Sequence, residues 1–305
     1  MAFSSNVKLE IAGTAPNKSC CRKAMAYGML EYGHAFGARE ISLQTELAPV
    51  ADIYATLVPD VCQVSAPTRD TLRRRTTLHT VSFPNPAQRE AVLETFGHAK
   101  NEISVRLNRA NLDCEDCARA YLRGAFMVCG AVSNPEHDYH LEFSVPYYNL
   151  SRNLLALLRE MNFPAKSVSR NGSYVIYLKE SEQIEDCLTF LGAPRGALEL
   201  MNIKMIKSIR NRTNRRINCE NANIDKTVAA AGIQVEALRR IEEQGGLQML
   251  PADLQELARL RLENPDMSLR ELGAAMQPPL SRSGVNHRLQ RILAFAQTLE
   301  NPQND

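Results

Sequence analysis

CRKAMAYGML (residues 21–30) and CARAYLRGAF (residues 117–126) decide the fold, because they are degenerate copies of one unit. They align without gaps: each begins with a cysteine, and a basic residue, an alanine and a glycine recur at equal spacing. The cysteines are Cys21 and Cys117, and the glycines are Gly28 and Gly124. A match this short can arise by chance, so the prediction of an internal repeat also depends on the segments after each copy.

The segments after the two copies correspond in order and in type. After the first copy come strand patterns at 41–47 and 78–83 and helix patterns at 50–57 and 87–96. After the second come a strand pattern at 139–145, a hairpin at 167–178 with an Asn171-Gly172 turn, and helix patterns at 151–161 and 181–191. Each half therefore has an αββαββα pattern. This predicts a pseudo-symmetric α+β domain over 1–200, with halves of about 1–100 and 101–200.

The pattern changes beyond residue 200. A basic linker is predicted at 201–222, and 223–305 has helical periodicity throughout. Gly245-Gly246 and Asn264-Pro265 are helix stop signals within that range. We therefore expect an all-α C-terminal domain at 223–305.

A helix-turn-helix motif is predicted at about 266–300. Ser268 and Glu271 form a capping box that starts a short helix, QPPL at 277–280 breaks it, and Ser281 can cap a final helix. In such motifs the second helix enters the major groove while its inner face packs on the first helix. The inner face is predicted to consist of Val285, Leu289, Ile292 and Phe295.

The beginning of the final helix carries polar residues that are suited to reading DNA. The candidate contact residues are Ser281, Arg282, Ser283, Asn286, His287, Arg288 and Arg291. Arginine can read guanine and asparagine can read adenine through paired hydrogen bonds. A structural helical bundle with solvated charges is the alternative interpretation of the same pattern.

A second basic feature precedes the helical domain. The segment Ile203–Arg216 has no acidic residue and contains Lys204, Lys207, Arg210, Arg212, Arg215 and Arg216. Clustered basic residues replace the counterions that condense on nucleic acid, so we predict contacts to the DNA backbone here. A solvated linker is the alternative. In the first domain, Arg69 and the run Arg73-Arg74-Arg75 are further candidate charges, with a solvated loop as their alternative.

The overall composition excludes several classes of protein. The chain has 305 residues, a net charge of +2 and 44% hydrophobic residues, as expected of a globular protein with about two domains. No apolar run is long enough for a membrane helix, and the start lacks the pattern of a secretory signal. We therefore expect a cytoplasmic protein with reduced cysteines and no membrane partner, and its predicted binding to DNA would associate it with the nucleoid.

The motifs predict neither a cofactor nor a metal. The chain contains no GxxxxGK[ST] phosphate loop, no HExxH and no GxSxG. Cys114 and Cys117 form one CxxC, to which Cys20 and Cys21 could add ligands, but a structural zinc site needs four. Without a second CxxC or a histidine pair, small buried thiols are the preferred interpretation. No small-molecule substrate is inferred.

Three stretches together resemble the WhiA family of bacterial DNA-binding proteins. They are CEDCARAYLRGAFMVCGAVSNPEHDYHLEF (114–143), RNRTNRRINCENANIDKTVAAA (210–231) and LPADLQELARLRLENPDMSLRELGAAMQPPLSRSGVNHRLQRI (250–292). The resemblance implies an N-terminal domain with the fold of LAGLIDADG homing endonucleases. It further implies a C-terminal helix-turn-helix similar to region 4 of sigma factors, and a role in cell division and chromosome segregation or in sporulation-gene transcription.

The endonuclease resemblance can be tested at the metal-binding acid, which is the eighth letter of the LAGLIDADG motif. That position is Gly33 in the first copy and Cys129 in the second. Cleavage with two metal ions needs hard oxygen ligands, which neither residue supplies. Glu31 lies two positions away, on another side of the helix. Gly28 and Gly124 fit a structural role, in which they let the two motif helices approach closely.

The sequence therefore predicts a non-enzymatic protein that binds double-stranded DNA, with a sigma factor or RNA polymerase as a further candidate partner. Two alternatives stay open. One is an adaptor that acts on RNA polymerase or a division component. The other is a catalytic LAGLIDADG nuclease with substitute acids.

Overall fold

The computed structural model describes residues 2–73, 76–100, 102 and 104–300. The chain divides into two compact units, Met1–Lys207 and Ser208–Asp305, and each is described by itself. Among the described residues, no helix is both long enough and apolar enough to cross a membrane.

The first unit contains the predicted repeat. After α1 (Phe3–Ala12), the first half consists of α2 (Ser19–Glu31), β1 (Ala35–Phe36), β2 (Ile41–Thr45), α3 (Ala48–Cys62), β3 (Thr68–Arg73), β4 (Thr77–Ser82) and α4 (Pro86–Thr95). After the short η1 (Arg109–Asn111), the second half consists of α5 (Glu115–Cys129), β5 (Gly130–Val132), β6 (Leu141–Val145), α6 (Tyr148–Glu160), β7 (Lys166–Arg170), β8 (Ser173–Leu178) and α7 (Ser181–Leu191). The predicted αββαββα order of both halves is confirmed.

The two sheets have the same topology, as a structural repeat requires. Each has four antiparallel strands, in the orders β1-β2-β4-β3 and β5-β6-β8-β7. The predicted hairpin forms between β7 and β8, where Asn171 and Gly172 both have positive φ angles of 49° and 79°. This conformation suits the right-handed twist of the flanking strands and explains the Asn-Gly pair.

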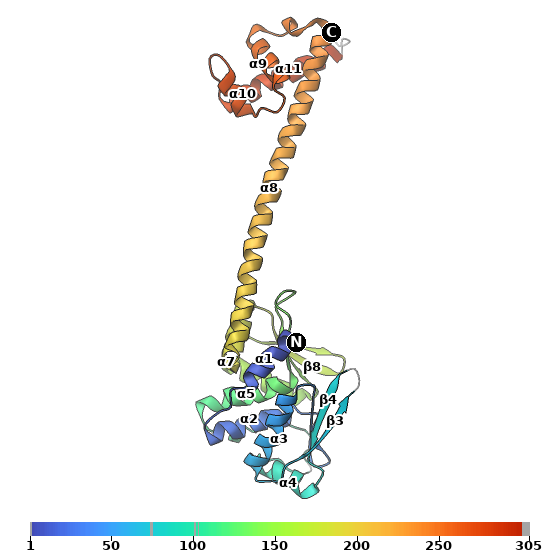
Figure 1. Ribbon diagram of the computed structural model, residues 1–305, viewed down its shortest axis with the longest axis vertical. Coiled ribbons are helices and arrows are strands. Elements are labelled where there is room, and N and C mark those ends of the chain that lie inside the picture. Colours follow the sequence, from blue (N-terminus) through green and yellow to red (C-terminus); the bar gives the residue numbers. More distant parts are fainter. Residues whose placement is uncertain (1, 74–75, 101, 103, 301–305) are drawn as a thin grey trace. The chain divides into compact units, whose positions relative to one another are not determined.

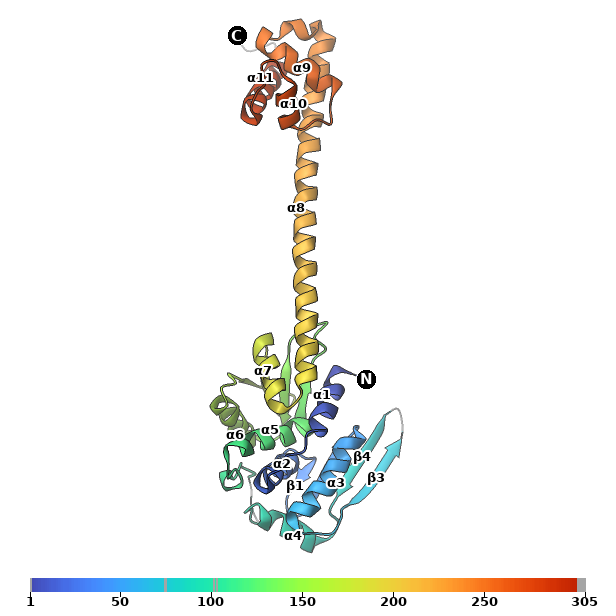
Figure 2. The same cartoon turned by 60° about the vertical axis from the view of Figure 1, so that its left-hand side comes forward.

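The helices α2 and α5 lie side by side at the centre of this unit (Figures 1 and 2). They touch backbone to backbone at the two repeat glycines. A Cβ atom at Gly28 would lie 2.2 Å from the carbonyl oxygen of Tyr121, and one at Gly124 would lie 2.2 Å from that of Met25. Any side chain at either position would therefore force the two helices apart.

The second unit is helical, as predicted. α8 (Pro194–Gly245) begins in the first unit and ends in the second, followed by η2 (Leu247–Met249), α9 (Ala252–Glu263), α10 (Leu269–Ala275) and α11 (Arg282–Glu300). The predicted linker residues, 201–222, are helical and belong to α8. No glycine or proline occurs between Ala197 and Ala231, so nothing in the sequence stops the helix there. A separate core includes Leu238, Ile241, Leu254, Leu257, Leu272, Val285 and Leu289.

The contact between the repeat glycines gives a direct test of the fold. We expect Gly124→Ala to lower the free energy of unfolding by about 3 kcal/mol, because its methyl group would overlap a backbone carbonyl that cannot rotate away. Urea unfolding of the full chain would measure the change. The control is Gly37→Ala, where an added Cβ meets no atom within 4 Å. Equal losses for the two variants would contradict the proposed close approach.

Candidate nucleic-acid interface

α10 and α11 form the predicted helix-turn-helix. The capping box is present: the Ser268 amide donates to Glu271 Oε2 at 2.8 Å, and the Glu271 amide donates to Ser268 Oγ at 3.3 Å. These bonds satisfy amides that have no partner within the first turn of the helix. The Ser268 backbone amide also holds the pKa of Glu271 below its usual value.

The turn between the helices packs directly on α10. The Leu280 amide donates to the Gly273 carbonyl at 2.8 Å, and a Cβ at Gly273 would lie 2.2 Å from the Leu280 carbonyl oxygen. The turn itself contains no glycine, so the close contact is provided by Gly273 in the preceding helix. On α11, Val285, Leu289 and Ile292 are buried as predicted, and Phe295 is half-buried.

The beginning of α11 presents most of its predicted contact residues to solvent. Ser281 caps the helix, because the Gly284 amide donates to its hydroxyl at 3.2 Å. Arg282, Ser283, Asn286 and His287 are exposed beyond the buried face. These side chains are therefore available at the helix end that enters the major groove in helix-turn-helix proteins.

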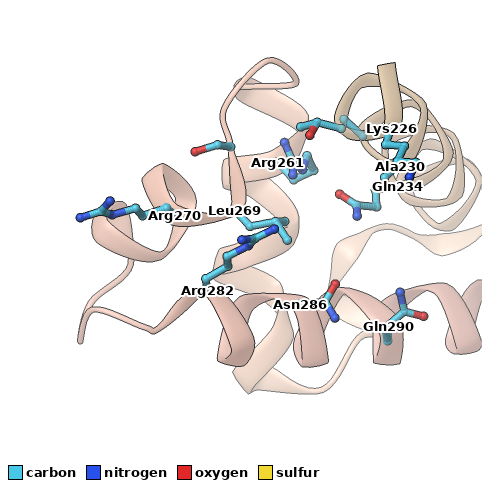
Figure 3. A pocket seen from close by; sticks show the side chains of 12 residues that line it. Lys226, Ala230, Gln234, Arg261, Leu269, Arg270, Arg282, Asn286 and Gln290 are labelled. Atoms are coloured by element: carbon cyan, nitrogen blue, oxygen red, sulfur yellow. The ribbon is translucent and has the colours of Figure 1, made fainter. Parts of the chain in front are cut away.

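One side of this helix lines a groove of about 470 Å³, which we call the α8–α11 groove. In Figure 3, Asn286 and Gln290 lie on the side of α11 that faces Gln234 of α8. The lining residues are Lys226, Thr227, Ala230, Ala231, Gln234, Arg261, Ser268, Leu269, Arg270, Arg282, Asn286 and Gln290. They include four basic and no acidic residues, so the groove favours an anionic ligand.

Arg288 and Arg291, in contrast, contact α9. Arg288 Nη1 donates to the Asp253 carbonyl at 2.9 Å, and Arg291 Nη1 donates to Asp253 Oδ2 at 2.6 Å. The Arg291 hydrogen bond holds the pKa of Asp253 below its usual range. Both arginines therefore have a structural contact that fixes the start of α9 against α11.

Arg261 also lines the groove, although it was not among the predicted contact residues. Its side chain is only 1% exposed, and Nη1 donates to the carbonyls of Pro265 at 3.2 Å and Met267 at 2.6 Å. Burial lowers its pKa. Its burial could have been predicted from the sequence, because its helical spacing from Leu254 and Leu257 places it on the buried face of α9.

The two lysines of the basic segment are engaged within the first unit. Lys204 Nζ lies 3.4 Å from Glu185 Oε1 and 3.5 Å from Glu182 Oε1. Lys207 Nζ donates to the Pro135 carbonyl at 2.8 Å and lies 5.2 Å from the centre of the Tyr139 ring. These contacts secure the beginning of α8.

The four arginines of the same segment are exposed on α8 in the second unit. Arg216 Nε pairs with Glu220 at 2.9 Å, whereas no ion pair of Arg210, Arg212 or Arg215 occurs within the described part of the chain. Arg212 and Arg216 precede Ala230 and Gln234 of the groove by about five helical turns, or roughly 27 Å. A whole number of turns places them on the groove side of α8.

The candidate charges of the first unit are partly engaged. Arg69 forms an ion pair with Asp52, and its Nη2 lies 3.0 Å from His79 Nδ1. Arg73 is exposed at the end of β3. Arg74 and Arg75 lie outside the described residues.

Gly33 and Cys129, the residues predicted to align with the nuclease acids, have no carboxylate side chain. At Gly33, a Cβ atom would lie 2.8 Å from the Ser42 carbonyl oxygen, so the position has no room for a side chain. Burial raises the pKa of the Cys129 thiol to about 12, which keeps it protonated. Neither position can supply the anionic oxygen that Mg²⁺ prefers.

Glu31, the nearest carboxyl group, is enclosed in the core. Its side chain is 2% exposed and accepts a hydrogen bond from the Tyr121 hydroxyl. Burial raises its pKa from 4.5 to about 8, so it is largely neutral at neutral pH. His98 belongs to the same buried polar cluster, because its Nε2 atom lies 3.9 Å from Glu31 Oε1 and 2.7 Å from the Tyr27 hydroxyl.

Comparison with known proteins gives consistent matches over both units. The model of the WhiA LAGLIDADG-like domain matches residues 118–210, and the model of the WhiA C-terminal HTH domain matches residues 213–296. A protein named probable cell division protein WhiA, from Caldicellulosiruptor saccharolyticus, is 36% identical over 98% of this chain and 96% of its own length. Another with that name, from Clostridium botulinum, is 44% identical over 69% of each chain.

The fold also matches a solved structure. Full-length WhiA from Thermotoga maritima aligns with a TM-score of 0.58 and 20% identity, over 97% of this chain and 98% of the other. At this identity the match supports the fold, including a LAGLIDADG-like first unit and a helical second unit.

The burial of Glu31 predicts how the free energy of unfolding changes with pH. Because the folded-state pKa of Glu31 lies above its unfolded value, the contribution of this group to stability is fully present below about pH 4.5 and is lost as pH rises through about 8. Glu31→Gln mimics the neutral form, so at pH 8 we expect this variant to be more stable than the wild type by on the order of 2 kcal/mol. Urea unfolding between pH 5 and pH 8.5 would measure both proteins.

The matched control is Glu160→Gln, because Glu160 is an exposed carboxylate whose pKa is lowered by its hydrogen bond from Arg109. This change should leave the pH dependence above pH 5 as in the wild type. If Glu31→Gln keeps the pH dependence of the wild type, Glu31 is ionised in the folded protein and burial does not hold it neutral.

Proposed function

Since this chain belongs to the WhiA family, we propose that it binds double-stranded DNA through α11 and acts in cell division without catalysing a reaction. The observation that supports DNA binding best is the exposure of Arg282, Ser283, Asn286 and His287 at the start of a helix whose opposite face is buried. Arg282 and Asn286 are suited to bidentate contacts with guanine and adenine.

We assign the DNA backbone contacts to the basic side of α8 that leads to the α8–α11 groove. Arg212 and Arg216 lie on that side, Arg215 is exposed next to Arg216 in the helix, and Lys226 lines the groove itself. Contacts from these side chains to phosphates would hold α11 in register without reading sequence. Lys204 and Lys207 have partners in the first unit, and Arg288 and Arg291 have partners in α9, so we give all four a structural role.

We further propose that the first unit does not cleave DNA. A two-metal mechanism requires carboxylates that clamp the attacking and leaving oxygens. The motif positions are Gly33 and Cys129, and Glu31 is buried and largely neutral. These features support a domain that retains the fold of a homing endonuclease without its chemistry.

The relatives named probable cell division protein support a role in division. We propose that this role is exercised at the nucleoid, through chromosome segregation or through transcription with a sigma factor or RNA polymerase as partner. Mapping the cross-linked protein across the genome separates these roles. Sites at promoters would support transcription, whereas sites spread along the chromosome would support segregation.

Sequence reading by α11 can be tested with Arg282→Ala combined with Asn286→Ala. We expect this variant to lose roughly 10- to 100-fold in affinity for genomic fragments that the wild type enriches, and little for a scrambled duplex. Fluorescence anisotropy of the full chain with both duplexes would measure the loss. An equal loss on both duplexes would contradict base reading by these residues.

The backbone contacts make a separate prediction. Arg212→Ala combined with Arg215→Ala should weaken binding to every sequence alike and reduce the slope of log affinity against log salt by about 2. The control is Lys204→Ala combined with Lys207→Ala, which removes the same charge from the same segment where the side chains already have partners. The assignment would be overturned if the slope of log affinity against log salt became smaller in the lysine control but stayed at the wild-type value in the arginine variant.

Two further results would favour other functions. Weak binding of the wild type to all duplexes, with promoter occupancy in cells that depends on RNA polymerase, would indicate an adaptor. Magnesium-dependent nicking of a plasmid by the purified chain would restore the nuclease interpretation.

A further inference from the structure

Four cysteines from the two repeat helices meet in the first unit. Cys20 and Cys21 lie in the first turn of α2, Cys114 precedes α5, and Cys117 lies in the first turn of α5. Their sulfur atoms all lie within 4.8 Å of one another. In the part of the chain that the structure describes, no other group of three or more potential ligands is this close.

The distances between the sulfurs fit a single tetrahedral ion. Cys114 Sγ lies 3.6 Å from Cys20 Sγ, 3.6 Å from Cys21 Sγ and 3.5 Å from Cys117 Sγ, and Cys21 and Cys117 are 4.0 Å apart. Four thiolates at about 2.3 Å from zinc lie about 3.8 Å from one another. Disulfide-bonded sulfurs would be only about 2 Å apart, so the four thiols are free.

The burial and hydrogen bonding of the cluster also suit a structural metal. Cys21 and Cys117 are buried, and Cys20 and Cys114 are half-buried, so the cluster is largely closed to solvent. The Cys114 amide donates to Cys117 Sγ at 3.5 Å. Amide donors of this kind orient and stabilise thiolate ligands, and both helices direct their positive N-terminal ends towards the sulfurs.

Basic side chains adjoin the cluster. Cys21 lines a cavity of about 290 Å³ together with Lys18, Arg119 and Arg123. Lys18 and Arg119 pair with Asp116, which also lines this cavity, whereas Arg123 Nε is buried without a hydrogen-bond partner among the described residues. Zinc bound by four thiolates carries a net charge of −2, which this excess of basic groups offsets.

We propose that Cys20, Cys21, Cys114 and Cys117 bind one zinc ion and thereby fasten the start of α2 to the start of α5. Binding converts four thiols into thiolates and releases their four protons. All four positions around the ion are filled by protein, so the site is structural. An iron–sulfur cluster would need ligands spread around several metal atoms, whereas these sulfurs leave room for one ion.

The first experiment uses the wild-type chain, purified whole under reducing conditions. We expect elemental analysis to find one zinc per chain, without iron. Replacing the zinc with Co²⁺ should give the intense visible absorption of tetrahedral cobalt with thiolate ligands. Removing the metal with a chelator should lower the Tm by on the order of 5 °C, and one equivalent of Zn²⁺ should restore it.

Serine variants test whether these cysteines are the residues that bind the metal. Cys21→Ser and Cys114→Ser should each abolish the cobalt spectrum and the bound zinc. Cys219→Ser is the matched control and should retain both, because Cys219 is exposed on α8. The wild-type cobalt and chelator measurements need no variant, so the proposal stays testable if a serine variant does not fold.

Three results would overturn the proposal. The first is a wild-type chain that binds neither Zn²⁺ nor Co²⁺ while its thiols react freely. The second is a coloured protein that contains iron, and the third is a disulfide between any of the four cysteines in freshly purified protein. None of these outcomes bears on DNA binding, because the proposed DNA contacts lie in the second unit.

Discussion

The rest of the first unit depends on the contact between α2 and α5 at Gly28 and Gly124. Each glycine places its backbone against a carbonyl of the opposite helix, at a distance that no side chain could tolerate. Because the two glycines occupy equivalent repeat positions, the contact is symmetric, and each half adds a sheet of the same strand order. This contact fixes how the two helices lie along each other, so it also sets which side chains meet at their C-terminal ends and at their N-terminal ends.

Near the C-terminal ends lie Gly33 and Cys129, the residues predicted to align with the metal-binding acids of the LAGLIDADG motif, and Glu31 is buried with Tyr121. Gly33 has no side chain, the Cys129 thiol is held protonated by burial, and Glu31 is enclosed in the core, so these residues do not present an anionic oxygen. At the N-terminal ends, the same pairing brings four cysteines together. The close contact between α2 and α5 therefore encloses core residues near their C-terminal ends and brings the ligands of a candidate metal site together at their N-terminal ends.

In the second unit, the distinction between engaged and free basic residues matters more than the total charge. Arg288 and Arg291 reach Asp253, and Arg261 is buried against the loop before α10. Arg282 and Asn286 remain exposed beside the α8–α11 groove. Local contacts with α9 thus divide the polar residues of one helix into a structural group and a group that is available to a ligand.

Sequence alone determined the repeat, the hairpin turn, the capping box and the buried face of α11, because each depends on local periodicity or on neighbouring residues. It predicted the αββαββα order correctly, although β1, β3 and β5 had no strand pattern of their own. It also determined the family. Only the tertiary structure decided which basic residues have partners and that Glu31 is buried. It also decided that Cys20 and Cys21 meet Cys114 and Cys117, whereas the lack of a second CxxC had favoured small buried thiols over a metal site. These features join residues far apart in the chain, and their distances follow from how closely the two repeat helices pack.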